Sequence, residues 1–590
     1  MNVAKRDGRV VEFDAHKIYD AIIKAFNSVY SNNLTDEMLT FANKVAVDIA
    51  HRNADMPVEE IQDLVVKRLM ASKYKEVATA YVEYRHLHQM ARSQYAELMD
   101  AVAEKLQAKD VKNQNANVDE HSFGGRIGEA SDVVNKRYAL EYLVSPMAKA
   151  NHENNEIYIH DLNAYAVGSH NCLSIPFDKL LANGFNTRQT DVRPAQSINT
   201  AFQLVAVIFQ LQSLQQFGGV SATHLDWTMV PYVRKSFYKH YCDGVLWCEH
   251  NIDYIYFEKE MKDKKHTSET PIDDTSYEVY PNAKQYAMAM TTKECYQAVE
   301  GMYHNLNTLQ SRSGNQLPFT SINYGTCTLP EGRMVIKALL DVSIKGIGKL
   351  HRTSIFPCGI FQCMNGVNRH PGNPNYDMFQ LALKSTSLRL YPNYANVDWS
   401  NNAGYDINDP KTYFSTMGCR TANGMDINGM GQTKDGRGNI CPVTIIMPTL
   451  AMEAKEAANA AYPDANVIDC FMSLLDTKIH EAKDMLLERF DWICSQSPES
   501  AKFMYENNVM AGYVPEEGIR SALKHGTIVI GQIGLAETLQ ILIGCDHTKP
   551  EGMKLAKRIE QLFKDKCAEF KQRYHLNFGV YYTPRFSWVA

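Results

Sequence analysis

The sequence predicts a mixed α/β body preceded by a small helical domain. Hydrophobic residues make up 45% of the 590 residues, which is enough for a large core. In the body, a long helical pattern at 201–214 alternates with short β-branched runs at 443–447 and 527–530. Such alternation favours strands buried beneath helices. The first 95 or so residues instead show a hairpin signal followed by amphipathic helical patterns, so we expect a separate unit there.

The N-terminal unit should begin with a β-hairpin. Two extended runs, 3–6 and 9–13, flank Asp7-Gly8, and an Asp-Gly pair in this position is a strong type I′ turn signal. Asp14 can then cap a first helix, and Pro57 occupies a favoured first-turn position of a third. The spacing of apolar residues predicts four helices, beginning near residue 15, around 38–49, at 57–69 and at 74–85.

Two stretches should lie outside the packed core. Residues 111–121 (VKNQNANVDEH) are polar and rich in asparagine, which indicates a linker and entry loop. Residues 257–277 are highly charged, and we interpret them as a solvated surface insertion. We place the first domain at residues 1–93 and the second at 94–590.

Composition excludes several classes of protein. A formal net charge of −6 and a pI of about 6.4 do not favour a nucleic-acid surface. The start lacks the apolar run of a signal peptide, and no apolar stretch of membrane-spanning length occurs, so we expect a soluble, cytoplasmic protein. Thirteen cysteines, an odd number, argue against a disulfide framework. Without any CxxC pair, no structural metal site is expected in this chain.

Basic residues gather at the predicted hairpin tip, where Lys5, Arg6 and Arg9 are followed by Lys17. Several cations beside free backbone N–H groups suit the polyphosphate of a nucleotide. A basic hairpin tip can also be simply solvated, so the cluster alone does not establish a nucleotide-binding site.

The N-terminal unit also resembles the ATP-cone, over roughly residues 1–93. The segments that carry it are 3–8 (VAKRDG), 11–14 (VEFD), 17–18, 21–22 and 80–85 (AYVEYR). The resemblance implies that ATP or dATP binds as an overall activity switch. By this match, the nucleotide contacts are Lys5, Arg6, Asp7, Gly8 and Lys17. ATP-cones also occur on a transcriptional repressor, so this domain alone does not define an enzyme.

Four groups of motifs follow in order through the body. They are 113–117 (NQNAN) with 158–161 (YIHD) and 170–172 (HNC); 305–325; 355–357 (IFP) with 366–368 (GVN), 371–377 (PGNPNYD) and 389–392 (RLYP); and 417–420 (MGCR) with 438–439 (GN). In this order they resemble the anaerobic, class III ribonucleoside-triphosphate reductases, a glycyl-radical family. The resemblance covers nearly the whole chain. It implies reduction of ribonucleoside triphosphates to 2′-deoxyribonucleoside triphosphates for DNA synthesis.

The chemistry of this family explains the residue types. Abstracting the 3′ hydrogen of a ribose makes a radical at C3′, which eases loss of the 2′-OH as water. A cysteine thiyl suits the abstraction because its S–H bond is comparable in strength to the C–H bond. The resemblance assigns the thiyl to Cys419 and assigns Cys172 as the hydrogen donor to C2′ on the other face of the sugar. The family commonly uses formate as final reductant, which would explain why no third catalytic cysteine is needed.

An amide takes the place of the acid/base carboxylate found in aerobic reductases. Asn439 is the best candidate, since an amide can hydrogen-bond the substrate hydroxyls without titrating. Gly-Asn is also a common turn pair, and Asn423 and Asn428 lie in the same loop, so a structural role for Asn439 stays open.

Other polar and sulfur-containing residues have simpler explanations. We interpret His160-Asp161 as a helix-capping and hydrogen-bonding pair placed beside the site. Cys295, Cys327 and Cys441 are treated as core residues, because cysteine behaves as a small apolar side chain when buried.

The resemblance stops before the C-terminal domain of the family. It runs through 531–537 and 578–584, whereas the family continues with two zinc-binding CxxC pairs and a radical glycine in a motif like Arg-Val-x-Gly-Tyr. Gly552 and Gly579 lie in the wrong contexts to replace that glycine. A split gene, an intron or frameshift, or a deliberate truncation would each explain the ending. We therefore expect the glycyl radical and zinc to be supplied by a separate segment, without which this chain would bind nucleotides but not turn over.

The resemblance also implies a fold and partners. The expected fold is a ten-stranded α/β barrel of two antiparallel halves, with Cys419 on a loop through its centre. Expected partners are a second copy of the chain, a radical-SAM activating enzyme and deoxynucleotide specificity effectors. Two alternatives stay open: a glycyl-radical acyltransferase or lyase, which would lack the ATP-cone, and a catalytically incomplete nucleotide-binding fragment or regulator.

Overall fold

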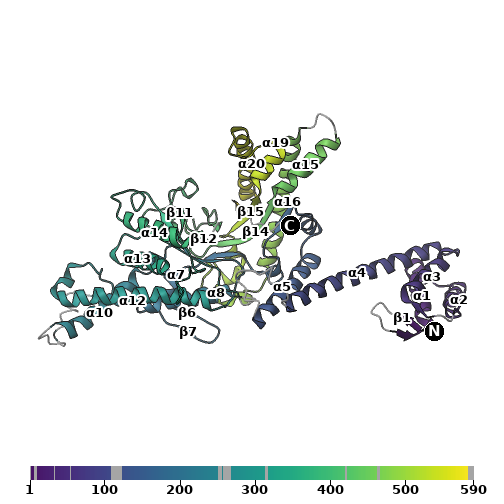
Figure 1. The fold of residues 1–590 in the computed structure, drawn as a ribbon, viewed down its shortest axis with the longest axis horizontal. Coiled ribbons are helices and arrows are strands. Elements are labelled where there is room, and N and C mark those ends of the chain that lie inside the picture. Colours follow the sequence, from purple (N-terminus) through teal and green to yellow (C-terminus); the bar gives the residue numbers. More distant parts are fainter. Residues whose placement is uncertain are drawn as a thin grey trace. The chain divides into compact units, whose positions relative to one another are not determined.

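The computed structural model shows two compact units, Met1–Glu104 and Lys105–Ala590 (Figure 1). Each unit folds around its own hydrophobic core, one built from residues between 3 and 81 and the other from residues between 139 and 578. The structure describes residues 2–4, 10–31, 33–52, 55–107, 122–249, 256, 259, 267–312, 316–418, 421–461 and 466–582.

The predicted N-terminal hairpin is confirmed. Strands β1 (Asn2–Ala4) and β2 (Val10–Glu12) are antiparallel, with Val3 opposite Val11. A third short strand, β3 (Met56–Pro57), adds to β1 in parallel. The turn, with Lys5, Arg6, Asp7 and Gly8, lies outside the described residues.

Four helices complete the N-terminal unit. They are α1 (Ala15–Tyr30), α2 (Asp36–Ala50), α3 (Val58–Met70) and α4 (Lys75–Gln107). The Asp14 side chain accepts a hydrogen bond from the backbone N–H of His16 at 3.0 Å, which confirms the predicted cap of α1. Pro57 precedes α3 as its N-cap instead of occupying its first turn, and α4 continues well past residue 85.

The second unit is built on a mixed sheet to which the described residues contribute nine strands. The order is β11-β10-β9-β8-β5-β14-β15-β16, with β4 beside β14. Their bounds are β4 (Ile157–Ile159), β5 (Cys172–Ser174), β8 (Val220–Ala222), β9 (Thr320–Tyr324), β10 (Cys358–Cys363), β11 (Asn393–Asn396), β14 (Gly438–Ile446), β15 (Thr527–Ile533) and β16 (Asn577–Tyr582). Neighbours from β11 to β5 are parallel, as are β14 to β16, and the two runs meet antiparallel at β5 and β14. This junction of two halves is the one expected of the predicted barrel.

Helices cover the sheet because parallel strands are joined by helical crossovers. The helices of the first half are α7 (Phe177–Asn183), α8 (Ile198–Ser213), α9 (Leu225–Thr228), α10 (Val230–Cys248), α12 (Pro281–Thr308), α13 (Pro330–Lys345) and α14 (Tyr376–Arg389). Those of the second half are α15 (Met447–Ala461), α16 (Val467–Cys494), α17 (Lys502–Glu506), α18 (Arg520–Leu523), α19 (Leu535–Ile543) and α20 (Pro550–Tyr574). Before the sheet come α5 (Phe123–Tyr142) and α6 (Pro146–Glu153). Figure 1 shows α10, α12, α13 and α14 gathered around the first half, with α15, α16, α19 and α20 grouped around the second.

A short hairpin lies against the middle of the sheet. It consists of β12 (Thr416–Met417) and β13 (Thr421–Ala422), which are antiparallel. Strand β12 contacts β5, β8 and β9, and β13 contacts β14. The segment that carries Cys419 is therefore brought to the junction of the two halves. A second small hairpin, β6 (Phe185–Asn186) with β7 (Asp191–Val192), follows α7.

The prediction that residues 257–277 form a solvated surface insertion is wrong for the end of this stretch. The charged stretch 257–277 ends in the buried residues Ile272 and Tyr277, and the Tyr277 ring packs against Phe237 and Tyr241. Apolar residues at the end of the stretch therefore return to the core. Most of 257–266, and the predicted linker 111–121, lie outside the described residues.

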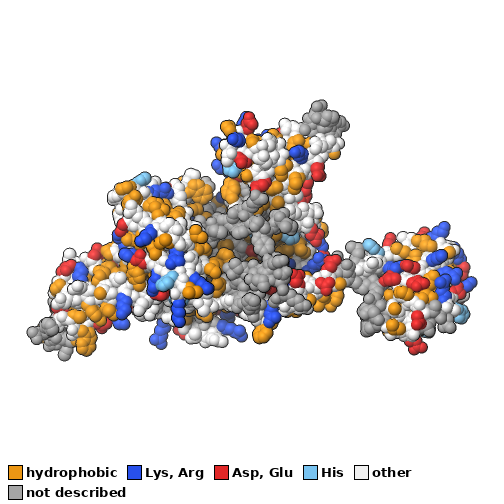
Figure 2. All heavy atoms as spheres, in the orientation of Figure 1, with side chains coloured by type: hydrophobic (Ala, Val, Ile, Leu, Met, Phe, Trp, Pro, Cys, Tyr) orange, Lys and Arg blue, Asp and Glu red, His pale blue; other side chains and the backbone are white. Residues whose placement is uncertain are grey.

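The surface agrees with the modest net charge. Figure 2 shows acidic and basic side chains interspersed over the visible face of each unit. Among the described residues, no helix is both long and apolar enough to cross a bilayer.

Candidate active site

A cavity of about 400 Å³ lies where the two halves of the sheet meet. Residues from both halves line it, including Cys172 from β5, Asn439 from β14 and Tyr581 from β16. Gly418 and Thr421, which flank the tip of the β12–β13 hairpin, line it as well. The cavity therefore combines the sheet junction with the loop that the sequence singled out.

Cys172 and Asn439 are direct cross-strand partners. They are paired in the antiparallel register of β5 and β14, which places their side chains on the same face of the sheet. Both side chains are buried, with exposed fractions of 8% and 1%. The backbone N–H of Gly219 donates to Cys172 Sγ at 3.2 Å. The structure thus brings together two of the three predicted catalytic residues.

Asn171, to which the sequence assigned no role, contacts both Cys172 and Asn439. Its Oδ1 accepts from Cys172 Sγ at 2.8 Å and lies 3.4 Å from Asn439 Nδ2. Its own Nδ2 donates to the carboxylate of Asp161. Asn439 Oδ1 is buried and has no hydrogen-bond partner among the described residues. A buried acceptor without a partner is costly, so this oxygen indicates a position where a hydrogen-bond donor would be stabilised.

The third predicted catalytic residue, Cys419, lies outside the described residues, as does Arg420. The residue before it, Gly418, has φ +66°, a left-handed conformation that favours glycine. A methyl group added to Gly219 would lie 3.8 Å from Cys172 Sγ and 3.9 Å from Gly418 N. Gly418 and Cys172 therefore both approach Gly219 at the wall of the cavity.

Arg312 is a second residue that the sequence argument missed. Its guanidinium is buried in the cavity wall, 4.4 Å from the centre of the Phe217 ring and 5.8 Å from that of Phe319. Burial lowers the pKa of this guanidinium, and the carboxylate of Asp161 partly opposes the shift. Arg312 lies in the motif segment 305–325, but nothing in its spacing marked it for the site.

His160 and Asp161 lie beside the cavity, as expected, although the predicted cap is wrong. Asp161 precedes the 3-10 turn Leu162–Ala164, but its side chain makes no cap hydrogen bond. It accepts from Asn171 instead. His160 Nε2 lies 2.6 Å from Thr444 Oγ1 and 2.9 Å from Tyr581 OH, so the ring joins β14 to β16.

The two other candidate asparagines of the loop hydrogen-bond backbone carbonyls. Asn423 Nδ2 donates to the carbonyl of Arg437 at 3.0 Å, and Asn428 Nδ2 donates to the carbonyl of Lys524 at 2.9 Å. Of the three candidate asparagines, Asn439 is the one that lines the cavity.

The three cysteines assigned to the core are confirmed there. Cys295, Cys327 and Cys441 are each fully buried. Burial raises the pKa of Cys295 and of Cys441 to about 12, so both stay protonated thiols.

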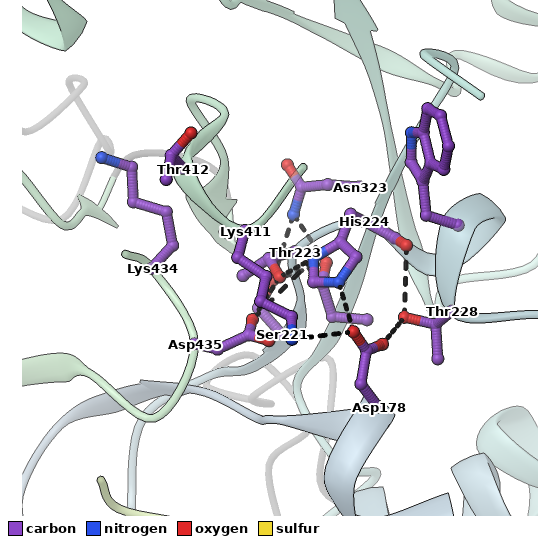
Figure 3. Close-up of polar contacts among 12 residues, drawn as sticks. Asp178, Ser221, Thr223, His224, Thr228, Asn323, Lys411, Thr412, Lys434 and Asp435 are labelled. Carbon is purple, nitrogen blue, oxygen red and sulfur yellow. Dashed lines mark hydrogen bonds and ion pairs between the residues drawn. The ribbon is translucent and has the colours of Figure 1, made fainter. Parts of the chain in front are cut away.

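A buried charge cluster lies beyond the cavity, at the end of β8 (Figure 3). His224 Nε2 is 3.1 Å from Asp178 Oδ2, and its Nδ1 is 2.6 Å from Thr223 Oγ1. Burial opposes a charge on His224, but the carboxylates of Asp435 and Asp178 outweigh it and raise its pKa to about 9. Lys411 Nζ adds an ion pair to Asp178 at 3.4 Å. Asp178, His224 and Asp435 are close enough to share a metal ion, but both ring nitrogens already have partners. We describe the group as an ion-pair network.

Comparison with known proteins identifies the family. The model of the family described as anaerobic ribonucleoside-triphosphate reductase matches residues 114–587, and the ATP cone domain matches residues 1–90. The chain belongs to the anaerobic ribonucleoside-triphosphate reductase family. Its first unit carries the ATP-cone of an allosteric enzyme.

Relatives of the reductase family match almost the full chain. The anaerobic ribonucleoside-triphosphate reductase of Haemophilus influenzae is 28% identical over 597 residues, covering 99% of this chain and 76% of that protein. The Escherichia coli enzyme of the same name is 28% identical over 598 residues, with the same two coverages. The anaerobic ribonucleotide reductase of Thermotoga maritima, solved with citrate in its active site, matches with a TM-score of 0.55 at 14% identity, over 84% of this chain and 82% of that one. The structural match shows a shared fold.

The reductase residues expected from sequence divide into two groups. Cys172, Asn439 and Lys17 are described, whereas Cys419 and the hairpin-tip residues 5–8 lie outside the described part. Lys17 lies in the first turn of α1 with a largely exposed side chain, 3.9 Å from the carboxylate of Asp14.

Proposed function

We propose that this chain reduces ribonucleoside triphosphates to 2′-deoxyribonucleoside triphosphates, with formate as the reductant and deoxynucleotides for DNA synthesis as the product. The observation that carries the proposal is the cavity in which Cys172 and Asn439 face the loop segment that leads into Cys419. The overall reaction balances as ribonucleotide plus formate plus a proton giving deoxyribonucleotide, carbon dioxide and water.

Each predicted residue has one task in this reaction. A glycyl radical brought to Cys419 would take its thiol hydrogen and leave a thiyl there. Cys419 then removes the 3′ hydrogen atom of the ribose, and the 2′-OH leaves as water with the proton of the 3′-OH, which leaves a ketone at C3′ and a radical at C2′. Cys172 delivers a hydrogen atom to C2′ from the opposite face of the sugar. Formate returns a hydrogen atom to Cys172 and, with a proton, an electron to the 3′ ketone, leaving as carbon dioxide, and Cys419 gives the hydrogen atom back to C3′. The buried amide of Asn439 hydrogen-bonds the substrate hydroxyls, which it can do without changing its charge.

The walls of the cavity suit radical chemistry. Cys172 is buried and its thiol donates to a neutral amide oxygen, which keeps the S–H bond intact until the substrate radical forms. Among the described residues that line this cavity, Arg312 is the one arginine or lysine, and we assign it to orienting the substrate.

Nucleotides other than the substrate regulate the activity. We assign ATP or dATP to the N-terminal unit, with Lys17 and the hairpin-tip residues as contacts. One structure of the Thermotoga maritima reductase was solved in complex with dATP and CTP (TM-score 0.54, 14% identity, covering 84% of this chain and 75% of that one), which supports nucleotide binding by this fold. A homodimer and a radical-SAM activating enzyme complete the proposed system.

The test is an anaerobic assay with ¹⁴C-formate, a ribonucleoside triphosphate and the activating enzyme, with and without an added glycyl-radical segment. We expect deoxynucleotide and labelled carbon dioxide in equal amounts. Cys419→Ser and Cys172→Ser should each lower turnover by more than 10³-fold while the substrate Kd changes less than twofold. If Cys172→Ser turns over at a tenth of the normal rate or faster, Cys172 is not the hydrogen donor to C2′.

A further inference from the structure

The inner face of the first half of the sheet carries buried polar side chains where apolar ones are expected. Ser221 on β8, Asn323 on β9 and Gln362 on β10 are all fully buried. Burying an amide or hydroxyl is unfavourable unless its hydrogen bonds are made inside the protein. Their partners therefore indicate what the three side chains are for.

All three bind the backbone of one short segment, 414–418, which leads into Cys419. Gln362 Nε2 donates to the carbonyl of Phe414 at 2.9 Å. Ser221 Oγ donates to the carbonyl of Thr416 at 2.9 Å. A fourth buried residue, Ser321 on β9, accepts from Gly418 N at 3.0 Å.

Asn323 makes the most complete of these contacts. Its Nδ2 donates to the carbonyl of Thr416 at 3.0 Å, and its Oδ1 accepts from the backbone N–H of the same residue at 3.1 Å. One side-chain amide thus satisfies both backbone groups of Thr416, as a neighbouring strand would. In the described part of the chain, β12 has β13 as its ladder partner, so side chains from the sheet hold its other edge.

The segment after β13, at residues 434–435, is held at the end of β8. Asp435 accepts from Thr223 Oγ1, and Thr223 directly follows β8. Lys434 N donates to the carbonyl of Lys411 at 2.9 Å. This hydrogen bond links the segment after β13 to the segment before β12. Figure 3 shows the side chains of Ser221, Asn323 and His224 near Lys411 and Asp435, which lie before β12 and after β13.

We propose that Asn323 is a positioning residue for Cys419, with Ser221, Ser321 and Gln362 in support. The proposal rests on the proposed function, in which Cys419 has to meet the 3′ hydrogen of the substrate. Asn323 fixes Thr416, three residues before Cys419, and Ser321 fixes the residue immediately before it. A reacting group displaced by about 1 Å can lose about 10²-fold in rate, so a small shift of this segment is enough to impair the chemistry.

The test compares Asn323→Leu with a matched control, Asn375→Leu. Asn375 is equally buried and donates to the backbone carbonyls of Gly325 and Cys327 at 3.2 and 2.8 Å, away from the loop. For Asn323→Leu we expect kcat to fall about 100-fold while the substrate Kd stays within twofold. The control should keep kcat within about threefold at a similar loss of stability.

A second readout does not depend on catalysis. The rate at which iodoacetamide alkylates Cys419, followed by mass spectrometry under anaerobic conditions, should change at least fivefold in Asn323→Leu and little in the control. Ser321→Ala, which removes one hydrogen bond, should shift both readouts in the same direction by a smaller factor and serves if Asn323→Leu does not fold.

The outcomes separate the two proposals. If the wild-type chain, supplied with the glycyl-radical segment and the activating enzyme, reduces no nucleotide but the alkylation rate still changes in Asn323→Leu, the proposed function fails and the positioning role stands. If turnover is normal in Ser321→Ala and in Asn323→Leu, or if the alkylation rate matches that of the control, the positioning role is wrong.

Discussion

At the scale of single residues, one amide oxygen contacts two of the proposed catalytic side chains. Asn171 Oδ1 accepts from Cys172 and lies near the amide of Asn439, while Asn171 Nδ2 is fixed by Asp161. The orientation of the proposed hydrogen donor and of the proposed substrate-binding amide therefore depends on a residue to which we assign no part in bond making.

Replacing Asn171 by alanine should lower kcat by about 10- to 100-fold, because both catalytic groups lose their orientation. The substrate Kd should change less than threefold, since the walls of the cavity remain. Steady-state kinetics with a substrate-binding titration measure both values. Asn135→Ala on α5, which removes only a 3.4 Å contact to Ser131, is the control. A kcat within twofold of the wild-type value would show that Cys172 and Asn439 hold their own positions.

His224 makes the stability of the loop stems depend on pH. It faces Asp435, Asp178 and Asp226, and Lys411 approaches the same cluster. Its pKa is raised to about 9, above the ordinary histidine value of about 6.5, so the folded protein binds this proton more tightly than the unfolded chain. The stabilisation is complete below about pH 6.5 and is lost as the pH rises through about 9.

Urea unfolding of the wild type and of His224→Gln between pH 6 and pH 10 tests this linkage. The wild type should be more stable at pH 6, and the difference should shrink steadily toward pH 10. Taking the difference between the two proteins removes the other groups that titrate in this range. A difference that stays constant to pH 10 would mean that His224 is neutral in the cluster.

At the scale of elements, sequence reasoning worked where the signal is local. The Asp14 cap, the hairpin strands and the burial of Ile18, Ile22 and Phe26 follow from spacing and turn chemistry. The pairing of Cys172 with Asn439 joins segments 267 residues apart, and only the resemblance to a family related them. Asn171, Arg312 and Asn323 could not be found, because the sheet brings their partners together. These partners are side chains for Asn171, aromatic rings for Arg312 and backbone atoms for Asn323.

The segment 421–437 is a second element whose anchors are invisible in sequence. The buried carboxylate of Asp426 accepts from His525 Nδ1 at 2.8 Å and from Asn577 Nδ2 at 2.7 Å. It also accepts from the backbone N–H groups of Met430 and Asn428. Burial opposes its charge, but the hydrogen bonds from His525 and Asn577 hold the pKa of Asp426 far below its usual range. This turn is therefore fixed to the starts of β15 and β16.

Asp426→Asn should destabilise the second unit by about 2 kcal/mol, because it removes the charge of a buried acceptor that holds four hydrogen bonds while keeping the shape of the side chain. The loss should be present at pH 7 and should diminish below about pH 4, since the wild-type carboxylate contributes above its unfolded pKa and loses that contribution as the pH falls. Urea unfolding at about pH 2.5 and at pH 7 measures it, because the stabilisation is lost between the unfolded and the folded pKa of the carboxyl. Asp469→Asn, which removes an exposed pair with Arg558, should cost well under 1 kcal/mol in the same assay.

At the scale of the whole molecule, two separate cores imply two cooperative units. The N-terminal core and the sheet core share no residues, and the ATP cone domain matches residues 1–90, within the first unit. A ligand that binds only the folded form of one unit stabilises that unit by mass action, by about 2.7 kcal/mol at a free concentration one hundred times its Kd.

Scanning calorimetry of the full chain should therefore show two transitions, and ATP should raise the temperature of the smaller one by binding to the N-terminal unit. For a unit of about 100 residues, 2.7 kcal/mol corresponds to a rise in Tm of about 10 °C or more. Lys17→Glu should reduce this rise without moving the larger transition, because the exposed Lys17 ammonium is a proposed phosphate contact and its pair with Asp14 is weak. Adenosine, which lacks the phosphates, is the matched ligand control. If ATP raises the larger transition alone, the nucleotide binds in the sheet unit, and the hairpin tip is not its site.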